Sequence, residues 1–184
     1  MAQETTREKQ RREPTEQQRE AARRQIRTVG DPVLRETAAP VTVFDDSLAQ
    51  LAERMLRIMR DAPGIGLAAP QIGVVKRLIV YGTDDEPRVL ANPEVTWRSD
   101  EVEAGDEGCL SVPGVTVPVE RPVRVRVHAD DLRGAPLDLE AEGLEARVIQ
   151  HEIDHLLGAL ILERTSRKER ARALRELRET EFPY

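Results

Sequence analysis

The sequence has one cysteine, few aromatic residues and no long hydrophobic run. Aromatic residues make up 3% of the 184 residues, and Cys109 is the one cysteine. Because a disulfide needs two cysteines, none can form within this chain, and packing has to hold the fold together. The longest apolar runs, such as residues 78–81 and 156–162, are far shorter than the roughly 20 residues that cross a bilayer. We therefore expect no membrane contact.

Neither sign of charge dominates the sequence. It contains 28 Lys and Arg against 34 Asp and Glu, which gives a net charge of -6. The basic residues are interleaved with acids, whereas DNA-binding domains are usually strongly basic, so we expect no DNA partner. Hydrophobic residues make up 39% of the chain, which is enough to fill one core, and the length suits a single domain.

Residues 1–27 contain eight basic and five acidic side chains and almost nothing that can be buried. Such a segment gains too little from burial to offset the entropy of ordering, so we expect a disordered or frayed helical N-terminal extension. It lacks the apolar core of a secretory signal, and its acids are atypical of an organellar transit peptide. We therefore expect cytoplasmic localisation.

Hydrophobic periodicity predicts three helices and several strands. Apolar residues recur at helical spacing over residues 47–60, after an acidic pair suited to an N-cap. A second helix, predicted over residues 144–160, has apolar surface on more than one side and should be internal. A charged, solvated C-terminal helix is expected from about residue 163, anchored mainly by Leu174 and Leu177. Strands are expected at residues 78–81, 89–90, 115–119 and 123–128.

The predicted internal helix contains the HExxH pattern, as His151-Glu152-Ile153-Asp154-His155. Residues four apart lie on one helix face, so both imidazoles can reach one metal ion, and Glu152 lies beside them to move a proton. Three polar side chains on a buried helix need partners. The pattern therefore favours metal-assisted hydrolysis over a pair of core histidines.

A catalytic site of this kind normally has three protein ligands, so the pattern requires a third. A histidine six residues after the second one is excluded, because residue 161 is Ile. Other candidates are His128 at a strand end and the acidic residues Glu163, Glu169 and Glu176 in the charged C-terminal segment. Cys109 is the strongest, because it lies in the glycine-flanked segment Glu107-Gly108-Cys109-Leu110-Ser111.

With this segment the sequence resembles a known family. Gly64-Ile65-Gly66-Leu67-Ala68-Ala69-Pro70-Gln71, the segment around Cys109 and the HExxH helix resemble, in order, the three motifs of bacterial peptide deformylases. The resemblance extends over residues 28–163. It implies an α+β fold, with antiparallel or mixed β-sheets around a central buried HExxH helix and a C-terminal helix. Residues 28–184 would form one metallohydrolase domain.

The resemblance implies a hydrolase of protein biosynthesis that removes the N-formyl group from the formyl-methionine of nascent peptides and releases formate. By resemblance, Cys109, His151 and His155 hold the metal, which supplies the attacking hydroxide. Glu152 acts as general base and acid. The implied cofactor is Fe²⁺, one per chain, with Zn²⁺, Ni²⁺ or Co²⁺ expected in purified protein.

The resemblance also assigns residues around the metal. The Gln71 amide and the Leu110 backbone N–H would stabilise the oxyanion. Ile65 and Gly66 would pair with the peptide backbone, and Asp154 would orient a ligand or a neighbouring loop. The slot for the methionine side chain would be formed by Glu107, Leu144, Arg147 and Val148.

One position departs from the family pattern. Many bacterial members carry a basic residue near the substrate entrance where this chain has Thr116, which bears on peptide preference and leaves the chemistry unchanged. The family also works at the ribosome exit region, and the arginines of the C-terminal segment could meet RNA phosphates there. A solvated helix is the alternative interpretation of that segment.

Two other functions fit the HExxH pattern. A zinc peptidase would use a Glu or His as its third ligand, and a metal-binding or ribosome-associated module would show no turnover.

Overall fold

The structure is a computed structural model that describes residues 13–82 and 87–181. A five-stranded sheet has the order β1-β2-β3-β6-β7, and β4 and β5 form a second, two-stranded sheet. Every pair of neighbouring strands is antiparallel. The strands are β1 (Gly66–Ala68), β2 (Leu78–Tyr81), β3 (Arg88–Arg98), β4 (Val102–Cys109), β5 (Val112–Pro122), β6 (Arg124–Asp130) and β7 (Pro136–Glu142).

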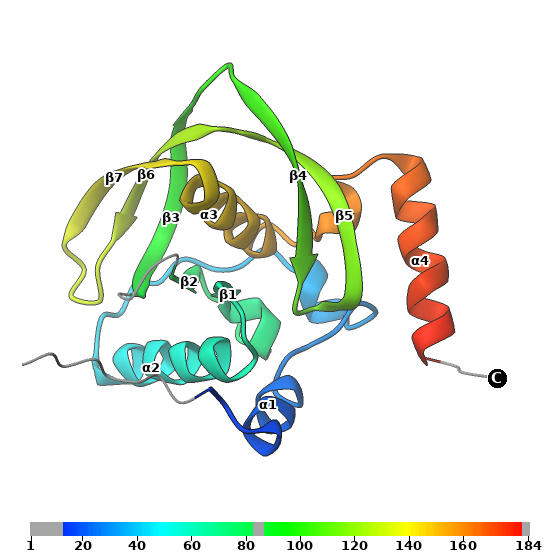
Figure 1. Ribbon diagram of the computed structural model, residues 1–184. Coiled ribbons are helices and arrows are strands. Elements are labelled where there is room, and N and C mark those ends of the chain that lie inside the picture. Colours follow the sequence, from blue (N-terminus) through cyan, green and yellow to red (C-terminus); the bar gives the residue numbers. More distant parts are fainter. Residues whose placement is uncertain (1–12, 83–86, 182–184) are drawn as a thin grey trace, which may run out of the picture.

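Helix α3 (Gly143–Leu156) lies between the two sheets (Figure 1). The expected α+β fold, with antiparallel sheets around a central HExxH helix and a C-terminal helix, is confirmed. One side of α3 packs its buried Ile149 and Leu156 with side chains of the five-stranded sheet. The other helical segments are α1 (Glu16–Arg23), α2 (Asp46–Asp61), α4 (Arg167–Glu181) and the short 3-10 turns η1 (Pro32–Arg35), η2 (Ala69–Ile72) and η3 (Ile161–Glu163).

The predicted elements are present, and most strands are longer than expected. The Asp45 side chain accepts hydrogen bonds from the backbone of Ser47 and Leu48, which starts α2 at the expected place. Strands β1, β4 and β7 were not predicted. β4 is largely exposed and rich in Gly and acidic residues, so no period-two apolar pattern marks it.

Helix α3 ends at Leu156, earlier than the predicted residue 160. Gly158 has φ +72, a left-handed conformation that glycine adopts without steric cost. The Ala159 N–H donates to Asp154 O at 2.9 Å, and the N–H of Ala38 donates to Leu156 O at 2.8 Å. These bonds satisfy carbonyls that the helix end would leave unpaired.

Apolar side chains near both charged ends of the chain are buried in the protein core. Within the N-terminal extension, Thr15 caps α1 in a capping box, and Ala22 and Ile26 are buried in a core with residues of α2. Residues 1–12 lie outside the described residues. At the other end, α4 begins at Arg167 rather than near residue 163, and Ala173 and Leu177 are its buried residues.

In the described ranges, no helix is both long and apolar enough to cross a membrane.

We predict that Gly158→Ala destabilises the protein more than Gly143→Ala does. Both glycines have positive φ, but a Cβ at Gly158 would lie 2.5 Å from Arg35 O, whereas a Cβ at Gly143 meets nothing within 4 Å. The left-handed conformation alone costs alanine about 1–2 kcal/mol. Denaturant unfolding should show that loss for Gly143→Ala and a larger one for Gly158→Ala. Equal losses would contradict the packing described for this helix end.

Candidate active site

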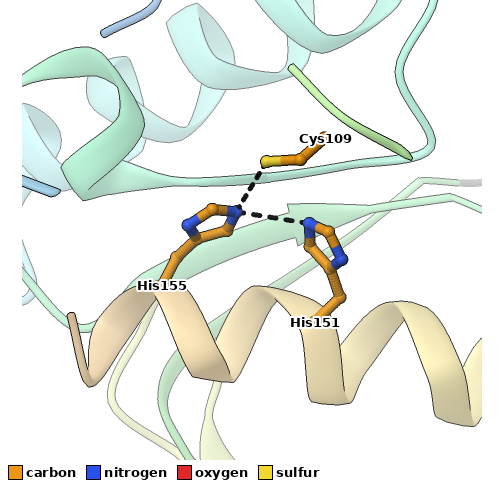
Figure 2. Close-up of side chains that lie close together, drawn as sticks. All are labelled: Cys109, His151 and His155. Atoms are coloured by element: carbon orange, nitrogen blue, oxygen red, sulfur yellow. Dashed lines mark hydrogen bonds between the residues drawn. The ribbon is translucent and has the colours of Figure 1, made fainter. Parts of the chain in front are cut away.

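Cys109, at the end of β4, and His151 and His155, on α3, point toward one another and bring three ligand atoms together (Figure 2). The Cys109 Sγ lies 3.3 Å from His155 Nε2, which in turn lies 3.3 Å from His151 Nε2. The three ligand atoms lie within 4.8 Å of one another. Among the described residues, this is the one group of three such side chains close enough to hold a metal ion.

Two of the three separations between the ligand atoms fit one tetrahedral ion. Metal–sulfur bonds of about 2.3 Å and metal–nitrogen bonds of about 2.1 Å put a sulfur and a nitrogen roughly 3.6 Å apart, and two nitrogens roughly 3.4 Å apart. The observed 3.3 Å separations are close to these values. Three ligands from the protein leave one tetrahedral position for water or substrate, as in catalytic sites.

The backbone explains how the sulfur reaches the helix. The β4–β5 register is irregular between Gly108 and Cys109, where Gly108 pairs with Thr116 and Cys109 pairs with Val112. The strand pair therefore turns sharply at the cysteine. The backbone N–H of Ser111 donates to Cys109 Sγ at 3.4 Å, a contact that stabilises negative charge on the sulfur.

Glu107 binds the ring nitrogen of His151 that faces away from the other two ligands. Its Oε2 lies 2.9 Å from His151 Nδ1, which leaves Nε2 to face Cys109 and His155. Burial alone would raise the pKa of Glu107, but hydrogen bonds from Arg121 and His151 outweigh it and lower this pKa to about 2. A permanently charged carboxylate on the distal nitrogen fixes the ring and makes it a stronger ligand.

Arg121 connects Glu107 to Asp154, which lies on α3 three residues after His151. Its guanidinium donates two hydrogen bonds of 2.8 Å to the Glu107 carboxylate and one of 2.7 Å to Asp154. Arg164 binds Asp154 from the other side, at 2.5 and 3.0 Å. The expected supporting role of Asp154 therefore has a structural basis. Sequence analysis did not single out Arg121, although it continues the inward-facing alternation of β5.

Glu152 lies beside the ligands and not among them. Its side chain is buried, and its Oε2 has no hydrogen-bond partner among the described residues. Burial raises the pKa of Glu152 to about 7, so this carboxyl can both accept and donate a proton near neutral pH. A Cβ at Gly66 would lie 2.2 Å from Glu152 Oε1. The carboxyl therefore occupies space that only a glycine leaves open.

Gln71 is buried and aimed at the same place. Its Nε2 lies 3.1 Å from Ser111 Oγ and 3.8 Å from Cys109 Sγ, while its Oε1 accepts the backbone N–H of Ala68 at 2.8 Å. The last contact fixes the amide so that its NH₂ group faces the ligands. An amide held in this way can donate to negative charge without reorganising.

The remaining predicted site residues line one cavity of about 810 Å³ together with Cys109 and His151. Of the residues predicted around the metal, the buried His155 and Asp154 lie outside that lining. Ile65 and Leu144 are about half exposed, as expected of residues that face a substrate. Arg147 is held by Glu107 and by the Val119 and Glu103 carbonyls. The cavity-lining set is Ile65, Gly66, Gln71, Glu107, Leu110, Leu144, Arg147, Val148 and Glu152.

The alternative third ligands have partners elsewhere. The His128 ring binds the exposed Asp138 at 2.8 Å. Glu163 pairs with Arg35 at 2.7 Å. Both Glu169 and Glu176 pair with Arg172 on the surface of α4. None of these four residues joins the cysteine and the two histidines in the described site.

Comparison with known proteins identifies the family. The profile of the polypeptide deformylase family matches residues 23–171. The chain belongs to this family. It is 47% identical to a peptide deformylase of Acidothermus cellulolyticus, over 86% of this chain and 88% of the relative. It is 50% identical to one of Dictyoglomus thermophilum, over 77% of this chain and 92% of the relative.

Solved peptide deformylases have the same fold. The Synechococcus elongatus enzyme in complex with actinonin matches with a TM-score of 0.80 and 45% identity, over 82% of this chain and 85% of that chain. The Legionella pneumophila enzyme matches with a TM-score of 0.80 and 42% identity, over 85% of this chain and 94% of that chain. The resemblance stated from the three motifs is confirmed, and the chain is an enzyme of the peptide deformylase family.

We predict that Gly66→Ala lowers deformylase activity strongly and that Gly108→Ala does so weakly. A Cβ at Gly66 meets the Glu152 carboxyl at 2.2 Å, whereas a Cβ at Gly108 makes an ordinary contact with Thr116 at 3.6 Å. Displacing a reacting group by about 1 Å can cost roughly 100-fold. Steady-state kcat/KM for a formyl-methionyl peptide measures both variants. Similar losses in the two would show that Glu152 does not need this space.

We predict that Glu107→Gln weakens metal binding by about 10- to 100-fold, because the amide no longer presents a charged oxygen to His151 Nδ1. Chelator competition with Ni²⁺ measures the dissociation constant. Glu103→Gln is the matched control, since Glu103 lies exposed on the same strand and uses its backbone oxygen to bind Arg147. Unchanged affinity in Glu107→Gln would remove Glu107 from the support of the site.

Proposed function

We propose that this enzyme hydrolyses the N-formyl group of formyl-methionine at the start of nascent peptides, with a divalent metal ion held by Cys109, His151 and His155. Membership of the family supports the substrate class. The convergence of one sulfur and two ring nitrogens within 4.8 Å is the observation that carries the proposed metal dependence. When bound, the ion supplies Lewis acidity that lowers the pKa of a water molecule.

The residues around this centre have complementary roles in the proposed reaction. Glu152, with its pKa raised to about 7, takes a proton from the attacking water and returns it to the leaving amine. The fixed amide of Gln71 and the backbone N–H of Leu110 stabilise the charge that develops on the formyl oxygen. Each such donor contributes about 3–4 kcal/mol to the lowering of the barrier.

The cavity supports an extended peptide substrate. Ile65 and Gly66 precede and begin the edge strand β1, whose partner β2 lies on one side only, so its other edge can pair with a peptide backbone. The proposed slot for the methionine side chain combines the buried Val148 with Leu144 and the aliphatic part of Arg147.

The identity of the metal and the place of work are further parts of the proposal. A thiolate and two imidazoles suit several transition ions, and we propose Fe²⁺ as the physiological one, with Zn²⁺, Ni²⁺ or Co²⁺ able to occupy the site. We propose that the enzyme works in the cytoplasm, near the ribosome exit region. The exposed arginines of α4 are suited to contact with RNA phosphates there.

We predict that Glu152→Gln loses about 100- to 10,000-fold of kcat while keeping one metal ion per chain, because proton transfer contributes about that much. Formate release from a formyl-Met peptide by anaerobically prepared protein, with metal content measured on the same sample, tests this. The control is Glu142→Gln, the same substitution at an exposed glutamate just before α3. Undiminished turnover in Glu152→Gln would overturn the assigned role.

We predict that Cys109→Ala loses the metal and with it the formate release. The substitution removes one of three ligands without adding bulk to a buried site. Metal analysis after dialysis measures this loss. A Cys109→Ala protein with full metal occupancy would favour a peptidase with a different third ligand.

A further inference from the structure

The N-terminal segment forms part of the wall of the active-site cavity. Arg23 at the end of α1, and Ile26 and Thr28 after it, line the same cavity as Cys109 and Glu152. Arg23 is the first residue matched by the family profile, so the rest of α1 lies outside the matched range. The wall is therefore contributed by an element that the three motifs do not include.

Two backbone hydrogen bonds attach this segment to the loops of the site. The N–H of Arg27 donates to Gln71 O at 2.7 Å, and the N–H of Val29 donates to Ser111 O at 2.7 Å. Gln71 supplies the amide of the site, and Ser111 lies in the turn that follows Cys109. The segment after α1 is thus joined to both loops that position reacting groups.

Helix α1 is also fixed against α2. Ala22 and Ile26 are buried in the core that contains the apolar face of α2. On the surface, the Arg54 guanidinium donates two hydrogen bonds, of 3.2 and 3.1 Å, to the Gln25 side chain. These contacts hold the end of α1, and with it Arg23, at a defined place on the cavity rim.

Arg23 is the exposed cation among the cavity-lining residues. Arg147, the other cavity-lining arginine, is paired with the buried Glu107 at 2.9 Å. The ion-pair partner of Arg23 in the described structure is Glu16 at 3.4 Å, and both side chains are more than half exposed. Such a pair contributes little, so the guanidinium is available to another carboxylate.

We propose that the end of α1 forms a subsite for the peptide beyond the formyl-methionine, in which Arg23 binds a carboxylate of the substrate. This inference rests on the proposed function. The ligand is an acidic side chain a few residues after the methionine, and a free C-terminal carboxylate of a short peptide offers the same chemistry. Asp106, exposed on β4, also lines the cavity and opposes the effect, so the contribution of Arg23 is measured by comparing variants.

The test compares kcat/KM for C-terminally amidated peptides, formyl-Met-Ala-Xaa and formyl-Met-Ala-Ala-Xaa, with Glu or Gln as Xaa. We expect Arg23→Gln to lower the ratio of the Glu to the Gln peptide about two- to fivefold at low salt, the range of one partly exposed ion pair. The change should lie in KM and should vanish at high salt, because salt screens exposed charges. Peptides with free and amidated termini, otherwise identical, separate a side-chain ligand from a terminal one.

Arg24→Gln is the matched control, because Arg24 is the next residue, is exposed, pairs with Glu20 and does not line the cavity. It should leave the Glu-to-Gln ratio at the wild-type value, whereas Arg23→Glu should lower the ratio further than Arg23→Gln. An unchanged ratio in Arg23→Gln, with formate still released from the Gln peptide, overturns the subsite alone. Absence of formate release from every peptide overturns the proposed function and the subsite with it.

Discussion

Helix α3 places Glu152, Asp154 and His155 in the interior, with His151 nearly as buried. Each of these polar groups needs a partner, because an unpaired charge in the interior costs several kcal/mol. Asp154 is satisfied by two arginines, and His151 by Glu107 on one nitrogen. The atoms left facing one another are Cys109 Sγ and the two Nε2 atoms. Among the described residues, Glu152 Oε2 and His155 Nδ1 have no hydrogen-bond partner. The fold therefore pairs Asp154 and one nitrogen of His151 and leaves the three ligand atoms for an ion.

The chain of contacts from Arg164 through Asp154, Arg121 and Glu107 to His151 crosses several elements. It joins the segment before α4 to the hairpin of β4 and β5 and to helix α3. Arg121 is 6% exposed, and removing one partner of such a buried pair typically costs about 3–5 kcal/mol. The geometry of the ligands thus depends on packing contacts well outside the HExxH pattern.

The sequence predicted the parts of this arrangement that follow a period or a motif. The helical stripes of α2 and α3, the β-branched strands and the grouping of Cys109, His151 and His155 were predictable, and the family comparison bears out the fold. Strand β4 carries Cys109 but has no apolar alternation, so only the motif located the cysteine. Glu107 was predicted as a substrate residue and lines the cavity. Its carboxylate also binds His151 and two arginines, contacts that were not predicted. Long-range ion pairs of this kind leave no local signal, although the inward position of Arg121 on β5 was readable from the alternation of buried valines.

The N-terminal extension contains burial that its composition did not indicate. Its composition predicted a disordered or frayed helical extension. In the part that the structure describes, Ala22 and Ile26 are buried in one core with residues of α2. The capping box at Thr15 and the backbone hydrogen bonds to Gln71 and Ser111 also offset part of the entropy lost on ordering. The docked segment borders the cavity.

X-ray absorption at the edge of the bound metal tests the central claim most directly. With the metal-loaded protein, the account predicts a first shell containing one sulfur at about 2.3 Å and two nitrogens at about 2.1 Å. A shell made of oxygen and nitrogen alone, with no sulfur, would contradict it.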